Sequence, residues 1–185
     1  ITESFMYLYH PQFERLKKFK DESKQLHSII CRFGIPKLNN PGFRNDPKLC
    51  GGAFWDVASY PASAIISLCQ GQEVKVLFSE IFKQEDSPVD SGGRALLLIS
   101  EGVSAYFEWG VGIAYKNEID LWSENGSFYT DKIFSKPVDY VPSYHQKDLH
   151  GNEIIEYGEK SEQFLEMFNS FIEMFGNEQK VIAER

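Results

Sequence analysis

The chain has 185 residues, enough for one well-packed domain, and its 42% hydrophobic and 25% charged residues are close to the average for globular domains. A formal net charge of −8, with Lys and Arg scattered along the chain, argues against binding to nucleic acid or to an anionic membrane surface. No run of 18 apolar residues occurs, so the sequence predicts no membrane-spanning segment.

The three cysteines, Cys31, Cys50 and Cys69, are odd in number and lack metal-ligand spacing. They favour a reduced, cytoplasmic setting, and no signal-peptide pattern opens the chain. The chain begins with Ile rather than Met, and its first residues read as the middle of a strand. We therefore expect a fragment or an excised domain, with N-terminal processing as the alternative.

The first half of the chain predicts alternating strands and helices. His10-Pro11 ends an opening strand, because proline suits the first position of a helix. A loop rich in Pro, Gly and Asn precedes the central helix, in which Pro61 predicts a kink and which Gly71 ends. The predicted elements are a strand over 1–9, a helix over 11–20, a strand over 26–35 and the central helix over 52–69.

The second half reads as hairpin-linked strands followed by one helix. Glu101-Gly102 and Asn125-Gly126 are hairpin turn signals between segments rich in β-formers. The last helix has a strong apolar periodicity, with Ser161 as its cap and Gly176 as its end. The predicted strands cover 74–82, 94–100, 103–111, 119–123, 127–134 and 152–157, with a connection over 135–151 and the helix over 161–175.

This order predicts an α+β fold made of one large, mostly antiparallel, open-faced sheet with helices on one face, as a single domain over 1–185. In the strand over 103–111, Phe107 and Trp109 point to one side and Tyr106 to the other. Aromatic residues make up 15% of the chain. They fit either a ring-rich core or a partner surface, and rings on the open face favour a dimer or docking to another domain.

The segment over 39–61 is the densest in residues that could carry chemistry. Asp56 and Tyr60 are four residues apart and so share one helix face, where a phenol can pass a proton to a carbonyl oxygen. Asp56 alone would raise the pKa of that phenol, so a cation must come from elsewhere. Arg44 could bind a phosphate or carboxylate. The plain alternatives are a common helix pair and an arginine that anchors a loop.

Other candidates are weaker. Tyr7, Tyr9 and His10 could line a pocket, or simply end a strand and cap a helix. His145 and His150 lie in a loop without the spacing or the neighbouring carboxylates of a metal site, so we expect no metal. Neither a G-x-G-x-x-G phosphate loop nor a G-x-S-x-G nucleophile turn occurs, so this chain offers no cofactor-binding residues of its own.

Three segments resemble the Gfo/Idh/MocA oxidoreductases, the family of glucose–fructose oxidoreductase and inositol dehydrogenase. ESFMYLYHPQ is similar to the family's E-A-F-M-Y-R-Y-H-P-Q segment, and FRNDPKLCGGAFWDVASYP resembles its N-x-R…G-G-G-A-L-x-D-x-G-x-Y-P signature. WGVGIAYKNEIDLWSENGSF and the later FSKP are similar to a stretch in members that act on nucleotide-linked or related sugars. The three segments occur in the family's order, within about residues 3–137.

The resemblance implies a C-terminal domain of the dihydrodipicolinate reductase-like type, without the N-terminal Rossmann domain that holds NAD or NADP and a lysine from an E-K-P motif. It implies that Asp56 and Tyr60 occupy the catalytic positions, with Tyr60 exchanging the proton, and that Arg44 lies near the substrate. We add Tyr7 and His10 as candidate substrate-binding residues.

Three positions depart from the family pattern. Leu8 stands where many members have Arg, Ala58 replaces the glycine of D-x-G, and Cys50 replaces the first glycine of the triplet. These departures put a substrate or cofactor anchor and the shape of the pocket in question.

Two functions remain open. The first is the substrate-binding and dimerisation half of an NAD(P)-dependent oxidoreductase acting on a sugar or sugar nucleotide, inactive without its Rossmann domain. The alternative is a non-catalytic binding or dimerisation module derived from that fold. The expected partners are the absent Rossmann domain, a second copy through the open sheet face, and a sugar.

Overall fold

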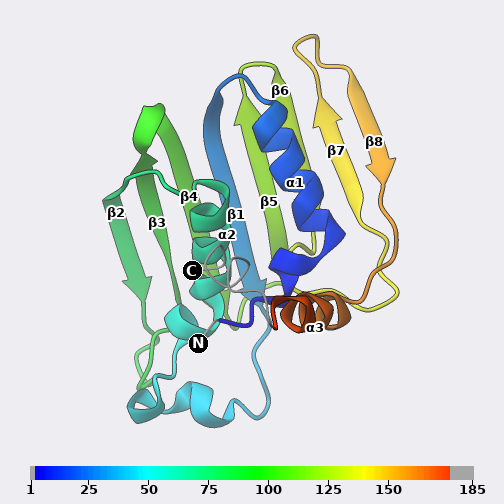
Figure 1. Cartoon of the computed structure of the whole chain (residues 1–185). Helices are drawn as coiled ribbons and strands as arrows, with labels where there is room; N and C mark the ends of the chain where they lie inside the picture. The colour runs from blue at the N-terminus through cyan, green and yellow to red at the C-terminus, as the bar shows by residue number, and fades with distance from the viewer. Residues whose placement is uncertain (1–2, 176–185) are drawn as a thin grey trace.

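The computed structural model describes residues 3–175 and contains one eight-stranded sheet (Figure 1). The strand order is β2-β3-β4-β1-β5-β6-β7-β8. The strands are β1 (Leu26–Ile35), β2 (Val74–Phe82), β3 (Gly92–Ile99), β4 (Val103–Val111), β5 (Lys116–Ser123), β6 (Gly126–Asp131), β7 (Ser143–Lys147) and β8 (Glu153–Tyr157).

Only β1 and β4 run parallel; every other neighbouring pair is antiparallel. The tight connections follow the turn signals in the sequence: Gly102, with φ of +81°, lies between β3 and β4, and Gly126 opens β6 directly after the turn from β5. Such a φ suits glycine because it has no Cβ. The predicted mostly antiparallel sheet is therefore confirmed.

Helices α1 (Pro11–Glu22) and α2 (Ser59–Leu68) cover one face of the sheet, and α3 (Gln163–Met174) lies across its end (Figure 1). Alternate residues of β4, including Phe107 and Trp109, are buried beneath the helices. One continuous core results, in which Leu16 of α1 and Ile65 of α2 are fully buried. The predicted open-faced sheet with helices on one face is confirmed.

The opening strand predicted over 1–9 is wrong where the structure describes it. Met6–Tyr9 form a 3₁₀ turn, in which the Leu8 amide donates to the Phe5 carbonyl at 3.0 Å. Tyr7 is fully buried in the core instead of pairing in a sheet. Residues 1–2 of this predicted strand lie outside the described residues.

The long connection predicted over 135–151 contains strand β7. Its five residues include only one buried ring, Tyr144, so the segment has no clear apolar alternation. Pairing with β6 on one side and β8 on the other makes it a strand. β6 also ends at Asp131 rather than at residue 134.

The predicted central helix is divided in two. Phe54–Ala58 form a π turn, and α2 then begins at Ser59 with Pro61 in its first turn. Proline is tolerated there because the first amides of a helix have no partner within it. At α3 the cap is Glu162 rather than Ser161: its carboxylate accepts from the amides of Phe164 and Leu165. Gly176, the predicted helix end, lies outside the described residues.

The open face combines apolar and charged side chains. Tyr106 lies on this face, as predicted, and its hydroxyl donates to Glu108 at 2.6 Å. Glu108 and Glu118 both pair with Arg32 on β1, at 3.2 and 3.1 Å. Burial disfavours the charged form of Glu118, but hydrogen bonds from Lys116, Arg32 and Tyr129 outweigh it and lower its pKa.

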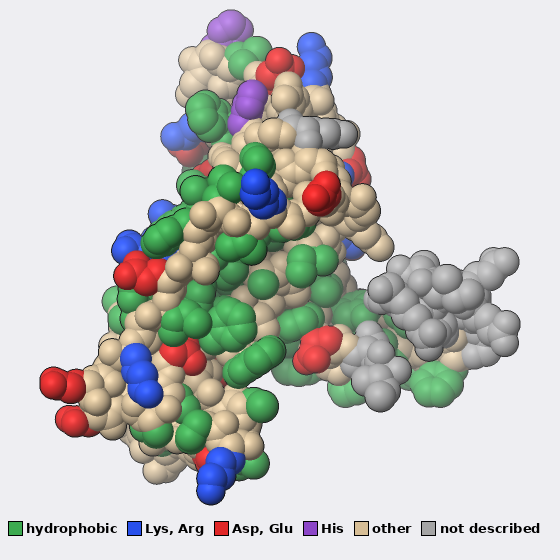
Figure 2. Space-filling model, turned by 90° about the vertical axis from the view of Figure 1, so that its left-hand side faces the viewer, with side chains coloured by type: hydrophobic (Ala, Val, Ile, Leu, Met, Phe, Trp, Pro, Cys, Tyr) green, Lys and Arg blue, Asp and Glu red, His purple; other side chains and the backbone are tan. Residues whose placement is uncertain are grey.

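Strand β2 forms an apolar edge of the sheet. Figure 2 views the molecule from this side and shows hydrophobic side chains gathered over it. The large exposed hydrophobic side chains of this strand are Val74, Val76, Leu77, Phe78, Ile81 and Phe82. Exposure on this scale is typical of surfaces that meet a partner.

Candidate functional site

Tyr60 lies in the first turn of α2, half-buried within a group of aromatic rings. Phe5 and Phe33 meet its ring edge-on, each with 5.3 Å between centroids. The rings of Tyr7 and Phe134 lie 6.0 and 6.2 Å away. Residues from the N-terminal segment, from β1 and from the chain after β6 thus fix the position of one phenol.

The Asp56 carboxylate lies on the π turn just before α2 and pairs with Arg44. The Arg44 Nε donates to Asp56 Oδ2 at 2.6 Å. The Arg44 guanidinium also lies 4.7 Å from the ring centre of Phe43. The structure therefore brings together the two charged residues predicted for the site, but the carboxylate binds the arginine and not the Tyr60 hydroxyl.

Burial and the nearby charges together set the pKa of the Tyr60 phenol. Burial, followed by the negative charges of Asp56 and Glu3, raises the pKa of the phenol, whereas the Arg44 guanidinium lowers it. The net direction is upward, so the phenol is protonated at neutral pH. A protonated phenol can donate a proton to an oxygen that gains negative charge.

The two glycines before the π turn allow the loop to close on itself. A Cβ on Gly51 would come within 2.7 Å of the carbonyl oxygens of Phe43 and Arg44. Gly52 has φ of +118°, and a Cβ there would overlap the Asp90 carboxylate. The Gly52 amide donates to the Arg44 carbonyl at 2.9 Å. These glycines therefore hold Arg44 beside the helix that carries Asp56.

Arg44 and Asp56 also line a cavity of about 170 Å³ next to this loop. Its other walls include Asp90, whose carboxylate accepts from the Phe54 amide at 2.8 Å, and Gln84. Tyr60 is not among the residues that line it. The cavity offers a cation and several polar groups close to, but separate from, the phenol.

Tyr7 is fully buried beside Tyr60. Its hydroxyl donates to the Tyr60 carbonyl at 3.1 Å and lies 2.6 Å from the Ser63 hydroxyl. Burial raises the pKa of Tyr7 far above its usual range. The Tyr7 side chain therefore meets Tyr60 through its ring and through the Tyr60 backbone carbonyl.

His10 is also fully buried and caps α1. Its Nδ1 accepts from the Gln12 amide at 3.0 Å, and its Nε2 lies 3.2 Å from the Ser161 carbonyl. Burial, followed by the positive charge of Lys136, lowers the pKa of His10 to about 4. The imidazole is therefore neutral at pH 7 and joins the start of α1 to the segment before α3.

Lys136 is a buried amine that the sequence analysis did not single out. Its Nζ donates to the Ile133 carbonyl at 3.0 Å and lies 3.5 Å from Gln163 Oε1 on α3. Burial lowers the pKa of this amine to about 7. A lysine between Ser and Pro gives no sequence signal of burial, because lysine is usually exposed.

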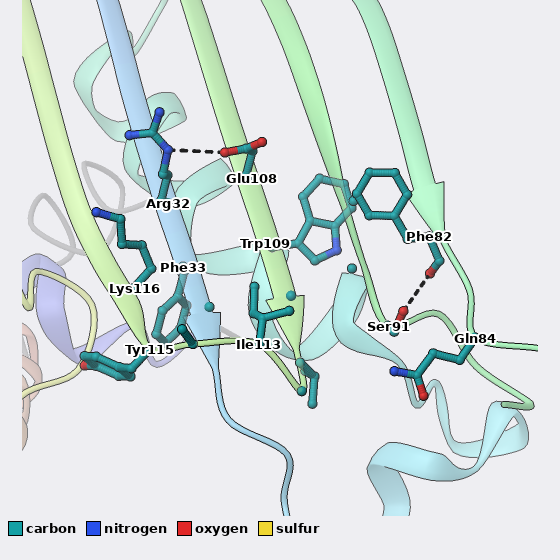
Figure 3. Close-up of a pocket in the computed structure, with 17 residues that line it drawn as sticks. Arg32, Phe33, Phe82, Gln84, Ser91, Glu108, Trp109, Ile113, Tyr115 and Lys116 are labelled. Carbon is teal, nitrogen blue, oxygen red and sulfur yellow. Dashed lines mark hydrogen bonds and ion pairs between the residues drawn. The ribbon is translucent and has the colours of Figure 1, made fainter.

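A second hollow, of about 480 Å³, lies at one end of the sheet (Figure 3). Gly34, Gly110 and Gly92 are paired side by side across β1, β4 and β3 and line it. The Ile113 side chain lies over Gly34 and Gly110, where a Cβ would come within 2.9 Å of it. The glycine row is thus explained by packing within the chain.

Among residues 3–175, no group of three or more His, Cys, Asp or Glu is placed to hold a metal ion. No helix in this part of the chain is long and apolar enough to cross a membrane.

Several characterised reductases are similar to this chain. It is 29% identical over 167 residues to a dTDP-3,4-didehydro-2,6-dideoxy-alpha-D-glucose 3-reductase of Actinomadura kijaniata, covering 89% of this chain and 47% of the relative. It is 28% identical over 142 residues to the reductase of the same name from Saccharopolyspora spinosa, covering 76% and 42%. The chain therefore spans about half the length of the curated relatives it matches.

Solved structures show the same fold. KijD10, a 3-ketoreductase from Actinomadura kijaniata in complex with NADP and TDP-benzene, superimposes with a TM-score of 0.87 at 25% identity, over 94% of this chain and 54% of that one. An aldose-aldose oxidoreductase from Caulobacter crescentus, at 15% identity and a TM-score of 0.80, shares the fold. The GFO/IDH/MocA C-terminal domain matches residues 23–129, more than half of the sequence. The chain belongs to the GFO/IDH/MocA C-terminal domain family.

Proposed function

We propose that this chain is the substrate-side half of an NADP-dependent reductase that acts on the ketone of a nucleotide-linked deoxysugar. The observation that carries the proposal is the Tyr60 phenol, fixed by surrounding rings four residues after Asp56, which pairs with Arg44, in a chain that is similar to a dTDP-sugar 3-reductase along 89% of its length. Reduction of a ketone needs a hydride at carbon and a proton at oxygen, and Tyr60 can supply the proton.

The cofactor belongs to the other half of the protein in this proposal. The chain contains no Gly-rich phosphate loop, which fits a cofactor held mainly elsewhere. When bound, a reduced nicotinamide supplies the hydride. The residues of this chain would bind and orient the sugar and donate the Tyr60 proton to its oxygen, so that the C=O becomes CH–OH.

Arg44 fits the role of a substrate anchor in this scheme. Its Nε is used by Asp56, and its guanidinium lines the cavity of about 170 Å³, where it could bind a phosphate oxygen. Asp56 would hold the guanidinium in place. Loss of the Asp56 carboxylate would therefore weaken substrate binding as well as alter the electrostatic field at Tyr60.

The substrate-binding role of Tyr7 and His10 remains a prediction. Both are fully buried, and their hydrogen bonds reach the Tyr60 backbone, the first turn of α1 and the Ser161 carbonyl just before α3. These contacts support an indirect role, in which the two side chains hold Tyr60 and the N-terminal segment in place for the substrate.

The non-catalytic module is the alternative, favoured by two positions. Leu8 replaces an arginine that many family members have, and Ala58, at 2% exposure, fills core space beside the site. In both cases we propose that two copies pair through the open sheet face, because that face carries exposed apolar side chains, among them Leu98, Trp122 and Ile155.

The deciding experiment uses the full-length gene product with NADPH and a dTDP-3-ketosugar, and follows the loss of NADPH absorbance. Turnover that requires both halves and disappears in Tyr60→Phe supports the reductase. A correctly folded full-length protein that binds NADPH but reduces no ketosugar would instead support the module.

A further inference from the structure

We propose that the exposed apolar side of α3 is the surface on which the nucleotide-binding half of the full-length protein docks. The inference rests on the proposed function, because that function assigns the cofactor to a second half. It goes further by naming the helix of this chain that holds the two halves together.

Helix α3 presents a continuous apolar stripe to solvent. Successive residues are about 100° apart around an α-helix, so residues spaced by three and four share one side. The large apolar side chains exposed on this side are Phe164 at 46%, Leu165 at 56%, Phe168 at 56% and Ile172 at 69%, and the C-cap residue Phe175, just after the helix, is 86% exposed.

Within residues 3–175, the domain leaves this stripe exposed. Among the described residues of α3 only Gln163 and Met167 are buried, on a different side of the helix. Phe171, at the margin of the stripe, packs edge-on against Tyr9 with 5.5 Å between ring centroids. An apolar stripe along the whole 12-residue helix is more exposed apolar surface than one helix on a monomer normally leaves in water.

The stripe lies beside the N-terminal segment, through which a preceding half would be connected to this domain. The N-terminal segment passes beside α3 (Figure 1), and His10 Nε2 lies 3.2 Å from the Ser161 carbonyl just before the helix. Phe5 of the same segment touches Tyr60. The N-terminal segment, the candidate site and α3 therefore lie at the same end of the sheet.

The occupant is inferred from the length of the relatives. The chain covers 47% of the Actinomadura kijaniata reductase and 54% of the KijD10 chain, and it matches a domain that is C-terminal by family. A half of similar size therefore precedes it in those proteins. A half attached through the N-terminal segment, which passes beside α3, would lie next to this helix, whereas a second copy has the open sheet face available.

Thiol labelling tests the docking directly. In a Cys50→Ser background, which removes the exposed native thiol while Cys31 and Cys69 stay buried, Ile172→Cys places a reporter on the stripe. We expect maleimide to modify this cysteine at least about 10-fold more slowly in the full-length protein than in the 185-residue chain, because docking removes it from water.

Leu149→Cys is the matched control. Leu149 is 73% exposed in the turn between β7 and β8, at the opposite end of the sheet from α3 (Figure 1). It should label at the same rate in both proteins. Circular dichroism and the unfolding midpoint establish that each variant is folded before labelling.

Each outcome is decisive. Equal rates at position 172 in both proteins overturn the docking surface, as does a full-length protein that carries no nucleotide-binding half. Protection that occurs already in the 185-residue chain and grows with its concentration assigns the stripe to a second copy and also overturns it. Labelling is independent of turnover. Protection of the cysteine at position 172 in a full-length protein that reduces no ketosugar would contradict the proposed reductase activity and still support the docking surface.

Discussion

The Tyr7 hydroxyl donates a hydrogen bond to the backbone carbonyl of Tyr60 at 3.1 Å, across 53 residues of sequence. This bond joins the N-terminal 3₁₀ turn to the first turn of α2, and the Ser63 hydroxyl donates to the same carbonyl at 2.8 Å. The position of the candidate proton donor is therefore set partly by a residue that precedes the whole sheet.

Tyr7→Phe removes the hydroxyl but keeps the ring. We expect the free energy of unfolding to fall by about 1–2 kcal/mol, because a buried hydrogen bond is lost and the Ser63 hydroxyl loses a partner. Urea denaturation measures the change. Tyr106→Phe is the control: its hydroxyl binds Glu108 on the open face, and its loss should cost about 0.5 kcal/mol or less.

Tyr60→Phe in the full-length protein should lower turnover by about 100-fold or more, the usual scale for loss of a general acid. The same variant should keep the unfolding midpoint within a few degrees, since the ring still packs against Phe5 and Phe33. Tyr129→Phe, on the open face, should leave turnover unchanged. Near-normal turnover of Tyr60→Phe would remove the phenol from the mechanism.

Gly52→Ala tests the closure of the loop that holds Arg44. At φ of +118°, and with the Asp90 carboxylate where the methyl group would lie, the variant should lose about 1–3 kcal/mol of stability. Gly71→Ala separates the two causes. Its φ is +81° but nothing lies within 4 Å of the added carbon, so backbone strain alone should cost about 1 kcal/mol. Equal losses would show that the Asp90 contact does not matter.

His10 makes stability depend on pH. The pKa of His10 is about 4 in the folded chain, against about 6.5 for a free histidine in the unfolded chain. Between these values the unfolded state binds more protons, so stability is lost as the pH falls from about 6.5 towards 4, with a slope of at most about 1.4 kcal/mol per pH unit.

Urea midpoints of the wild type and of His10→Gln across this range measure the contribution. The difference between the urea midpoints of the two proteins should be largest near pH 7 and should become smaller as the pH falls to 4. A difference that stays constant would show that His10 titrates alike in both states.

The isolated chain should bind no NADP and should self-associate through its open sheet face. Leu98 lies on that face of β3, in the same alternating set as Arg94, and is 39% exposed. Leu98→Glu should shift the sedimentation profile towards monomer, because a charge would be buried in the interface. Micromolar binding of NADP measured by calorimetry, or a wild type that stays monomeric at high concentration, would contradict these two expectations.

The sequence by itself determined the elements whose signals are local. The strand over 26–35 and the strands over 74–82 and 103–111 have the predicted bounds, because their composition and flanking turns act within a few residues. The hairpins at Gly102 and Gly126 follow from the turn residues. The motif around Asp56 and Tyr60 likewise showed the family, which the matched domain confirmed.

Tertiary structure alone decided the conformation of the N-terminal segment, the pairing of β7 and the contact between Arg44 and Asp56. Met6–Tyr9 became a 3₁₀ turn because Tyr7 finds its partners on α2, and β7 became a strand because β6 and β8 flank it. Arg44 reached Asp56 because two glycines let the loop fold back onto the helix, which no spacing in the sequence predicts. These outcomes depend on contacts between residues far apart in the chain, and local propensity does not specify which distant partners will meet.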